Sequence, residues 1–230
     1  MNPLLSVIIP ARNEAQALPL LLADLAALRE AGAELLLVDG GSSDASLELA
    51  AGHVDQLLSC AAGRSRQMNA GAAAAAGDYL WFVHADTRVS PEAIRHLLDV
   101  LIERPLWGRF DVRLSARGPM FRLIGGMISL RSRLSGIASG DQGIFVARAT
   151  FEALGGYADI PLMEDLELCR RLKRLAWPCC LRPALTTSSR RWEQQGIWRT
   201  LLLMWRLRLA YYCGVSPEKL ARQYQRGTPP

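Results

Sequence analysis

The sequence lacks the features that mark secreted, disulfide-bonded or membrane-spanning chains. Its five cysteines are an odd number, and no two of them form a Cys-x-x-Cys pair, which favours reduced thiols over a disulfide framework. No basic start and apolar signal core open the chain, and the apolar residues 4–10 are too few to span a bilayer. Arg206 and Arg208 interrupt the apolar stretch 201–213. These absences predict a cytoplasmic protein.

Charge is also sparse and unevenly placed. Charged residues make up 21% of the 230 residues and hydrophobic residues 50%, which suits a sizeable buried core and argues against disorder. The net charge is +5, yet residues 181–230 hold nine Arg and Lys against two Glu, so the rest of the chain is slightly acidic. A basic tail suggests an anionic partner. Without a recognised nucleic-acid module, we expect phosphate groups or a membrane surface rather than nucleic acid.

Apolar runs alternate with helical spacings over the first hundred residues. Strands are predicted at 4–10, 34–38, 56–59 and 79–83, and helices at 14–29, 45–51, 64–76 and 91–103, with Ser90 as the N-cap of the last. This alternation predicts an α/β fold with a mostly parallel sheet and helices on both faces. Ligands of such sheets bind beyond the carboxyl ends of the strands.

The pattern changes after Pro105. Strands are predicted at 107–114, 144–146 and 178–181, and helices at 119–134, 163–174, 197–212 and 217–225, with Gly125 and Gly126 as a weak spot in the helix 119–134. No internal repeat or linker divides the chain. We therefore expect one domain over residues 1–195 and a basic helical extension over residues 196–230.

Polar side chains follow two of the predicted strands. Asp39 precedes two glycines, where its carboxylate can accept hydrogen bonds from a base or ribose and the backbone can approach a ligand closely. Helix capping by Ser42, Ser43 or Asp44 explains much of this turn but does not require Asp39. His84 and Asp86 lie on one face of their strand. Asp86 could hold a hard divalent cation at a diphosphate, whereas a lone histidine is more typical of a hydrogen-bonded core residue.

Three other segments each allow a functional and a structural interpretation. Arg64 and Gln67 lie one turn apart at a helix start, which favours anions or is simply a solvated basic end. Glu164 and Asp165 begin another helix, where the helix dipole alone explains acids, or where one of them is a general base. The third segment, 188–192, is either a phosphate site or a surface loop with a packed tryptophan; it contains Arg190, Arg191 and Trp192.

Together these segments resemble family 2 glycosyltransferases of the GT-A fold. The stretch 6–14 is similar to that family's first strand and loop, and 39–44 to its nucleotide-binding turn. His84-Ala85-Asp86 falls where the family carries its Asp-x-Asp metal motif, and Glu164-Asp165 where it carries the acceptor-base pair. The match runs in order from Ser6 to Trp192. Each motif is weak alone, but four in the right order and strand context are specific.

The resemblance implies a role for each matching position. A nucleotide-sugar donor would lie against seven residues besides Asp39: Pro10, Arg12, Asn13, Glu14, Gly40, Arg64 and Gln67. Asp86, with His84 beside it, would bind Mg²⁺ or Mn²⁺ at the diphosphate. Asp165, with Glu164, would be the base for single-displacement transfer with inversion. Asp141 and Gln142 would face the donor sugar or the acceptor, and the diphosphate would lie near Arg190, Arg191 and Trp192.

One departure from the family pattern keeps other functions open. His84 replaces the first acid of Asp-x-Asp and removes one carboxylate. It supports the alternative of a catalytically silent sugar-nucleotide-binding or scaffold protein, against which the Glu164-Asp165 pair counts. A nucleotidyltransferase ranks last because residues 10–17 contain no glycine. The segments 63–69 and 84–87 also resemble a compact bacterial subgroup linked with arsenosugar-type biosynthesis and radical-SAM neighbours, which implies a small-molecule acceptor.

The predicted helix 197–212 is both apolar and basic. Aromatic and leucine residues recur along it at three- and four-residue steps, interleaved with Arg199, Arg206 and Arg208. Such a helix can lie in a membrane interface, or pack on the domain or on a second copy of the chain. The expected partners are therefore a nucleotide-sugar donor, a small-molecule or lipid-linked acceptor, a membrane surface at this helix, and a homo-oligomeric copy.

Overall fold

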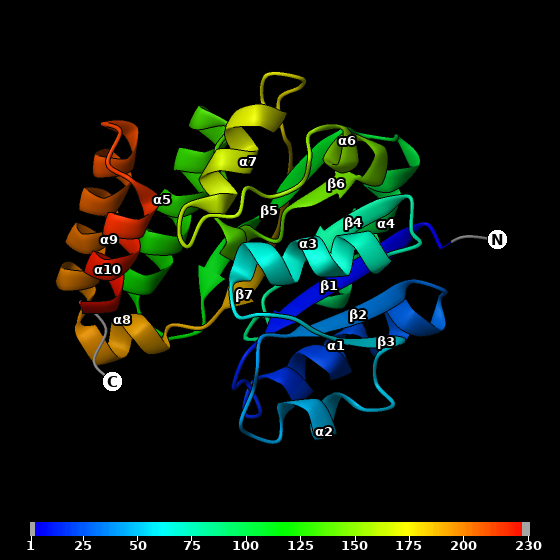
Figure 1. Ribbon diagram of the computed structural model, residues 1–230. Helices are drawn as coiled ribbons and strands as arrows, with labels where there is room; N and C mark the ends of the chain where they lie inside the picture. The colour runs from blue at the N-terminus through cyan, green and yellow to red at the C-terminus, as the bar shows by residue number, and fades with distance from the viewer. Residues whose placement is uncertain (1–2, 227–230) are drawn as a thin grey trace.

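The computed structural model describes residues 3–226, and side chains to residue 224. One seven-stranded sheet in the order β3-β2-β1-β4-β6-β5-β7 forms its centre (Figure 1). The strands are β1 (Leu5–Ala11), β2 (Glu34–Asp39), β3 (Gln56–Ser59), β4 (Tyr79–Phe82), β5 (Trp107–Leu114), β6 (Phe145–Ala147) and β7 (Cys179–Thr187).

Most neighbouring strands run parallel. β1 pairs with β2 and β4, β2 with β3, and β5 with β7, all in parallel. Only β6 runs antiparallel to the strands beside it, β4 and β5. The predicted α/β fold with a mostly parallel sheet is confirmed, and the antiparallel β6 is the detail that the apolar pattern did not reveal.

Helices cover both faces of the sheet (Figure 1). They are α1 (Leu18–Glu30), α2 (Ser46–Ala50), α3 (Arg64–Ala74), α4 (Pro91–Ile102), α5 (Pro119–Ser135), α6 (Arg148–Ala153), α7 (Glu164–Leu172), α8 (Arg190–Gln195), α9 (Ile197–Tyr212) and α10 (Pro217–Arg226). Alternate residues of β1 enter different cores: Val7 and Ile9 pack with α1 and α4, whereas Ile8 packs with α3 and α7. Ser90 caps α4, as predicted, by accepting from the amide of Ala93 at 3.2 Å.

Helix α3 lies unusually close to the sheet. A Cβ added at Gly71 would come within 2.5 Å of Ile8 Cγ2. The alanines beside Gly71 also carry little bulk. The short side chains therefore bring the start of α3 close to the strand ends of β1 and β2.

Helix α5 is attached to β5 through small and charged residues. A Cβ at Gly125 would lie 2.9 Å from the carbonyl oxygen of Val112, so this glycine is a close-packing position rather than the predicted weak spot. Ser129 Oγ accepts from the amide of Val112 at 3.1 Å. The fully buried Arg109 forms an ion pair with Asp111, whose other oxygen is 2.7 Å from Arg133.

Strand β7 continues well beyond its predicted end at residue 181. A register shift between Phe110 and Asp111 of β5 leaves Arg182 and Pro183 of β7 without partners in the ladder. Proline has no amide hydrogen to donate, and a bulge at the sheet edge accommodates it. The sequence also predicts neither α6 nor α8, each of which has six residues.

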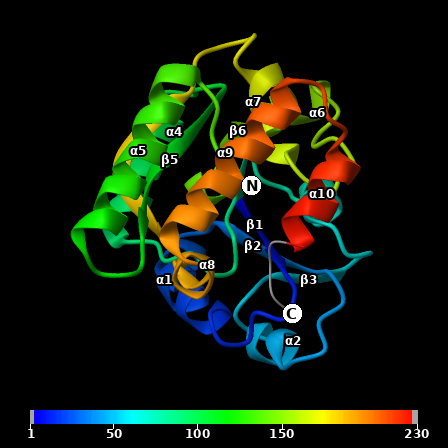
Figure 2. The same cartoon turned by 90° about the vertical axis from the view of Figure 1, so that its left-hand side faces the viewer.

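The helices α9 and α10 contribute to the core on the α3 side. Leu207 and Leu220 are fully buried there. In Figure 2, α5 and α9 lie side by side on the face toward the viewer, with α10 beyond α9. None of the described helices is both long and apolar enough to cross a membrane.

Candidate active site

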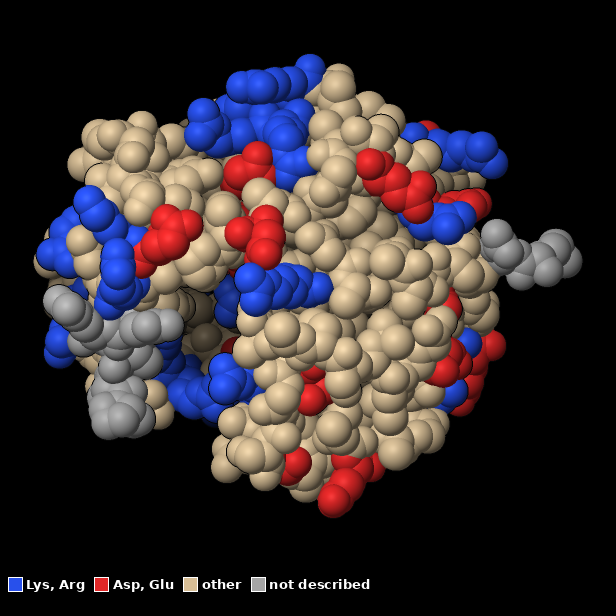
Figure 3. Space-filling view, in the orientation of Figure 1, with Lys and Arg blue, Asp and Glu red and all other residues tan. Residues whose placement is uncertain are grey.

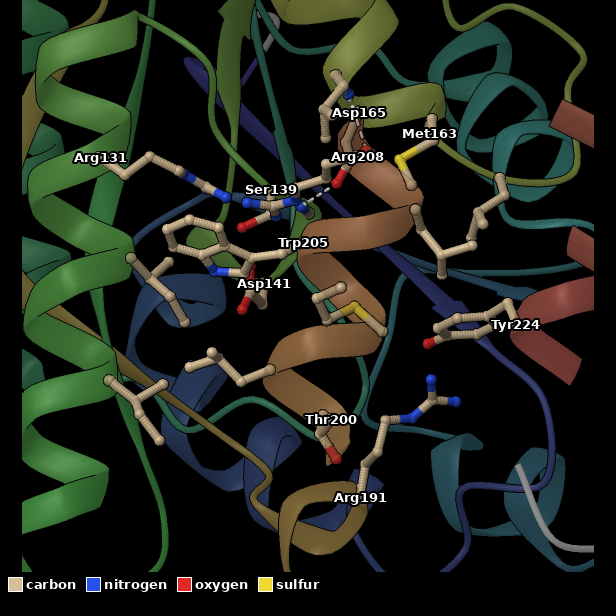
Figure 4. Close-up of a pocket in the computed structure, with 18 of the residues that line it drawn as sticks. Arg131, Ser139, Asp141, Met163, Asp165, Arg191, Thr200, Trp205, Arg208 and Tyr224 are labelled. Carbon is tan, nitrogen blue, oxygen red and sulfur yellow. Dashed lines mark hydrogen bonds between the residues drawn. The ribbon is translucent and has the colours of Figure 1, made fainter. Parts of the chain in front are cut away.

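A pocket of about 720 Å³ lies beyond the end of β4, between α5, α7 and α9. Eight residues that the sequence predicted line it: Arg64, His84, Asp86, Asp141, Glu164, Asp165, Arg191 and Trp192. Figure 4 shows several of its polar groups pointing into one space from these helices. The structure therefore gathers residues up to 128 positions apart in the sequence, from Arg64 to Trp192, at the expected edge of the sheet.

The first residues of α7 present Asp165 to the pocket. Met163, just before the helix, has φ +71°, a left-handed conformation that is costly for a residue other than glycine. Asp165 Oδ2 accepts from the amide of Gly140 at 2.7 Å, and Oδ1 from that of Leu166 at 2.8 Å. Burial and the charge of Glu164 raise the pKa of Asp165 to about 7. Such a carboxyl can exchange a proton with a ligand near neutral pH.

Glu164 lies behind Asp165 and is almost fully buried. Its Oε1 is 3.7 Å from Arg64 Nη1, and the Arg64 side chain is half exposed toward the pocket. The pair joins the start of α3 to the start of α7. The guanidinium of Arg64 also lies near the Asp165 and Asp86 carboxylates. Their negative charges, together with the larger effect of Glu164, raise the pKa of Arg64.

His84 is neutral and turned toward the protein. Burial lowers its pKa to about 3. Its Nε2 is buried, has no hydrogen-bond partner among the described residues, and would lie 2.8 Å from a Cβ at Gly140. The nitrogen therefore packs against the turn that carries Gly140, so a metal contact from this atom requires that turn to move.

Asp86 is the carboxylate that the sequence predicts as the cation ligand, and it lines the pocket. Burial raises its pKa, and the charges of Arg64 and Arg190 oppose this rise. Within the described part of the chain, no three His, Cys, Asp or Glu side chains form a group that could hold a metal ion. Mg²⁺ commonly binds through one or two carboxylates together with substrate phosphates and water. The residues present thus fit a cation that binds together with a diphosphate.

The loops after β1 and β2 are joined by hydrogen bonds. Asn13, which has φ +56°, accepts from the amide of Ser43 at 2.8 Å and donates its own amide to Ser42 Oγ at 2.9 Å. The next two amides donate to Ser46 and Asp44. The predicted nucleotide-binding segments 10–14 and 39–44 are therefore one connected unit, from which the side chain of Arg12 extends into solvent.

Asp39 shapes the turn in which it lies. Its carboxylate is nearly buried and accepts from the amides of Gly41 and Ser42 and from the Ser42 hydroxyl. The Gly40 amide donates to Ala11 at the end of β1. Asp39 thus fixes the backbone between the two strands.

Two of the residues predicted to contact a ligand, Gln67 and Gln142, turn their side chains inward, and their ligand contacts stay predictions. Both hydrogens of the Gln67 amide are used, by the carbonyls of Ala11 and Val38 at 2.8 Å, and its amide group would touch a Cβ at Gly40. Gln142 is fully buried and donates to Phe110 O and Ser132 Oγ. Gln67 supports the glycine turn from below, and Gln142 closes the turn 139–142.

Helix α8 carries the predicted arginine–tryptophan segment. Arg190 lies 3.7 Å from Glu14, so it joins α8 to the loop after β1. The Arg191 guanidinium lies 3.9 Å above the ring of Tyr224 on α10, and Figure 4 shows the two side chains facing each other at the pocket. Tyr224 was not predicted, because only the tertiary packing of α10 brings it to the pocket.

The pocket also contains residues for which the sequence gave no functional signal. Arg131 reaches into it from α5, and Trp205 and Arg208 from α9 (Figure 4). Trp205 and Arg208 belong to the helical spacing of 197–212, which predicted a membrane or packing surface. Arg131 is one of several arginines on its helix and has no motif around it.

The fold is that of the GT-A class of glycosyltransferases. The chain belongs to glycosyl transferase family 2, whose family model matches residues 6–151. Asp165 and α8 lie outside the matched segment. No curated protein matches the sequence.

Several solved structures share the fold. A fragment of TarS from S. aureus, in complex with UDP, has a TM-score of 0.64 at 16% identity over 80% of this chain. The match covers 60% of that fragment. Mannosyltransferase PcManGT from Pyrobaculum calidifontis, with GDP-Man and Mn²⁺, has a TM-score of 0.59 at 16% identity over 97% of this chain and 69% of its own.

A third structure holds both a cation and a product. Glucosyl-3-phosphoglycerate synthase from Mycobacterium tuberculosis, in complex with Mn²⁺, UDP and glucosyl-3-phosphoglycerate, has a TM-score of 0.56 at 20% identity. The match covers 81% of this chain and 71% of the synthase. At 16 to 20% identity, these similarities show a shared fold and nothing further.

Proposed function

We propose that this protein transfers a sugar from a nucleotide-sugar donor to a hydroxyl group of an acceptor, with inversion at the anomeric carbon. The observation that carries the proposal is Asp165, a carboxyl with a raised pKa that lines the pocket together with Asp86 and Arg64. Family membership supports the reaction class, and the neighbours bound to UDP or GDP-Man support the donor class.

Asp165 is the proposed general base. Its carboxylate accepts the proton of the acceptor hydroxyl while the acceptor oxygen attacks the anomeric carbon. The bond between that carbon and the diphosphate oxygen breaks, and the nucleoside diphosphate leaves with the electron pair. The amides of Gly140 and Leu166 hold Oδ2 and Oδ1 of Asp165 in place, and the remaining lone pairs of the carboxylate are the proposed acceptors of the proton.

The donor would lie across the joined loops. Residues 10–14 and the turn 39–41 form the proposed base and ribose site, with Asp39 and Gln67 holding the backbone in shape. The diphosphate would meet the guanidinium groups of Arg64, Arg190 and Arg191, which suit phosphate oxygens. Asp141, whose Oδ1 is buried without a hydrogen-bond partner among the described residues, is the proposed contact to the sugar.

Asp86 is the proposed ligand of Mg²⁺ or Mn²⁺. A divalent cation held there would supply Lewis-acid stabilisation of the negative charge on the leaving nucleoside diphosphate. Two of the neighbours hold Mn²⁺, which supports this proposal. The subgroup linked with arsenosugar-type biosynthesis, its small-molecule acceptor and the cytoplasmic location stay predictions from sequence.

Ligand binding tests the donor half of the proposal. A thermal-shift panel of UDP, UDP-GlcNAc and GDP-Man, each with and without Mn²⁺, should raise the melting temperature for at least one nucleotide. Absence of any shift at millimolar ligand would contradict a nucleotide-sugar site.

Asp165→Asn tests the catalytic half. The variant should bind the donor as the wild type does but lose donor turnover by about 10³-fold or more, because a general base contributes at least 10²-fold. The matched control is Asp159→Asn, an exposed acid outside the pocket, which should keep full turnover. His84 in place of the first acid of Asp-x-Asp favours one other candidate, a silent sugar-nucleotide-binding protein. Donor binding by the wild type without any turnover would select it.

A further inference from the structure

Helix α5 turns its small side chains inward and its large apolar side chains outward. Its buried residues are Ile124, Gly125, Ser129 and Ser132. Its exposed face carries Leu123, Met127, Leu130 and Leu134. An amphipathic helix on a globular domain normally does the opposite. The apolar stripe of α5 is therefore available to something other than the core of this domain.

Helix α9 beside it is apolar on its outer side as well as on its inner side, where Leu203, Met204 and Leu207 pack in the core. Thr200 and Leu207 are its buried residues. Five large residues along it are more than half exposed: Trp198, Leu202, Trp205, Leu209 and Tyr212. Because α5 and α9 lie side by side on one face (Figure 2), their stripes form one apolar surface. We call it the α5–α9 face.

The pocket opens through this face. Met127, Leu130, Leu134 and Trp205 are exposed at the surface and also line the pocket. Deeper in, Ile124, Ile128, Leu201 and Met204 continue the apolar wall. An apolar trough thus runs from the molecular surface to the carboxylates of Asp86 and Asp165. A soluble sugar or phosphate acceptor would not need an apolar path to these carboxylates.

The charge on the two helices has one sign. α5 and α9 carry three arginines each and no Asp or Glu. Inside the trough, Nε and Nη2 of Arg131 are buried without a hydrogen-bond partner among the described residues. Burial lowers the pKa of Arg131 and the charges of Asp141 and Asp165 raise it, so the guanidinium faces the catalytic end. Lysine and arginine side chains also surround a hollow near α9 and α10 in Figure 3.

A second copy of the chain fits this face poorly. In a two-fold symmetric dimer the same patch meets itself, so the arginines of α9 would come near those of the other copy, and neither α5 nor α9 supplies an acid to pair with them. A basic helix with Trp, Tyr and Leu on its other face is instead typical of a membrane interface with anionic lipid.

We propose that the acceptor is an anionic membrane lipid with a free hydroxyl group, and that the α5–α9 face binds the bilayer from which it is taken. The apolar chain would occupy the trough between α5 and α9. The anionic group would pair with Arg131 and Arg208, and the hydroxyl would reach Asp165. This proposal rests on the proposed function, and it names the acceptor class for that site.

The transfer balances with these groups. The lipid hydroxyl oxygen forms a bond to the anomeric carbon, and the bond from that carbon to the diphosphate oxygen breaks. The hydroxyl proton passes to Asp165, and the nucleoside diphosphate takes the electron pair. The products are a glycosylated lipid and a nucleoside diphosphate, and no oxidant or reductant takes part.

Vesicle sedimentation tests the face without any donor. The full chain is mixed with vesicles of phosphatidylcholine alone, or with one third phosphatidylglycerol. We expect it to sediment with the anionic vesicles and to remain in solution with the neutral ones. The double variant Leu130→Gln, Leu202→Gln should reduce partitioning by about ten-fold or more, because binding scales with buried apolar area.

A matched control carries the same chemical change elsewhere. Leu20→Gln, Ile102→Gln alters two exposed apolar residues on α1 and α4 and should sediment as the wild type does. Both double variants should melt near the wild-type temperature, because all four side chains are exposed. Equal sedimentation of the two double variants, or no sedimentation of the wild type, would overturn the proposal. So would a wild-type dimer that the Leu130, Leu202 variant dissociates without any vesicle binding.

Tryptophan quenching locates the acyl chain in the trough. Vesicles containing brominated phosphatidylglycerol should quench the wild-type fluorescence, and Trp205→Phe should lose part of the quenchable signal. Equal quenching in both proteins would overturn the placement in the trough. Brominated short-chain phosphatidylglycerol below its micellar concentration separates the sources. Quenching by this monomer with no vesicle binding would point to a soluble amphiphile and contradict the membrane source. Donor thermal shifts are independent of these readings, so failure of the face and failure of the donor site are distinguishable.

Discussion

Replacing Asp165 by asparagine should stabilise the fold while it removes the proposed base. Burial and Glu164 raise the folded-state pKa of Asp165 to about 7, whereas in the unfolded chain an aspartate titrates near pH 4. Because the folded-state value is the higher one, the ionised carboxylate destabilises the fold. This cost is absent below pH 4, grows as the pH rises, and is complete once the pH passes the folded-state pKa.

The size of the gain follows from opposing terms. A shift of about three pKa units corresponds to about 4 kcal/mol as an upper bound. Three effects reduce this upper bound on the gain in stability. Asp165 is partly exposed, it shares its charge with Glu164, and the variant loses one backbone hydrogen bond worth about 1 kcal/mol. We expect a net gain of about 1 to 2 kcal/mol at pH 8, or about 3 to 6 °C in melting temperature for a chain of this size.

Thermal melting at pH 8 and pH 5 measures this gain. The difference between Asp165→Asn and wild type should be larger at pH 8, and other titrating groups cancel in the comparison. Asp159→Asn removes an exposed ion pair with Arg66 and should change the melting temperature by no more than about 1 °C at either pH. An Asp165→Asn variant that melts at or below the wild-type temperature at pH 8 would refute the reasoning that burial makes Asp165 a base.

Two further variants examine the groups around the pocket. Gly140→Ala would place a methyl group 2.8 Å from His84 Nε2, so the turn must shift and its hydrogen bond to Asp165 weakens. We expect turnover to fall about 10- to 100-fold, with the donor-induced thermal shifts unchanged. Unchanged turnover would contradict the positioning role of this turn. Gln67→Leu would leave the carbonyls of Ala11 and Val38 without these donors. We expect the free energy of unfolding, measured in urea, to fall by about 2 to 3 kcal/mol. A decrease below about 0.5 kcal/mol would show that the Gln67 amide does not support the glycine turn.

The early part of the fold was predictable because each buried strand is a short apolar run. The carboxyl ends of those runs also located Asp39 and Asp86 correctly in the chain. The direction in which a polar side chain points was not predictable. Glutamine often contacts ligands, yet the amide groups of Gln67 and Gln142 donate to backbone carbonyls in the interior. A local pattern carries no information on which carbonyls a distant strand leaves unpaired.

Other features depend on tertiary context from the start. Pro183 indicates the end of a strand, but the bulge in β7 lets the strand continue past it. The left-handed conformation of Met163 has no sequence signal of its own, whereas asparagine, as at Asn13, is enriched in that conformation. The outward orientation of the leucines of α5 was also not predictable. Helical periodicity reveals that a helix has an apolar stripe, but it does not show whether the stripe faces the core or the solvent.

The two faces of α5 separate what the domain needs from what its ligand needs. The inner face, with Gly125 and Ser129 against β5, determines whether the helix seats on the sheet. The outer face, with Met127, Leu130 and Leu134, makes no comparable contribution to the core. Substitutions on the outer face can therefore accumulate at little cost in folding free energy. This arrangement lets selection change the acceptor of such an enzyme by altering one side of a single helix, while the donor site and the sheet stay as they are.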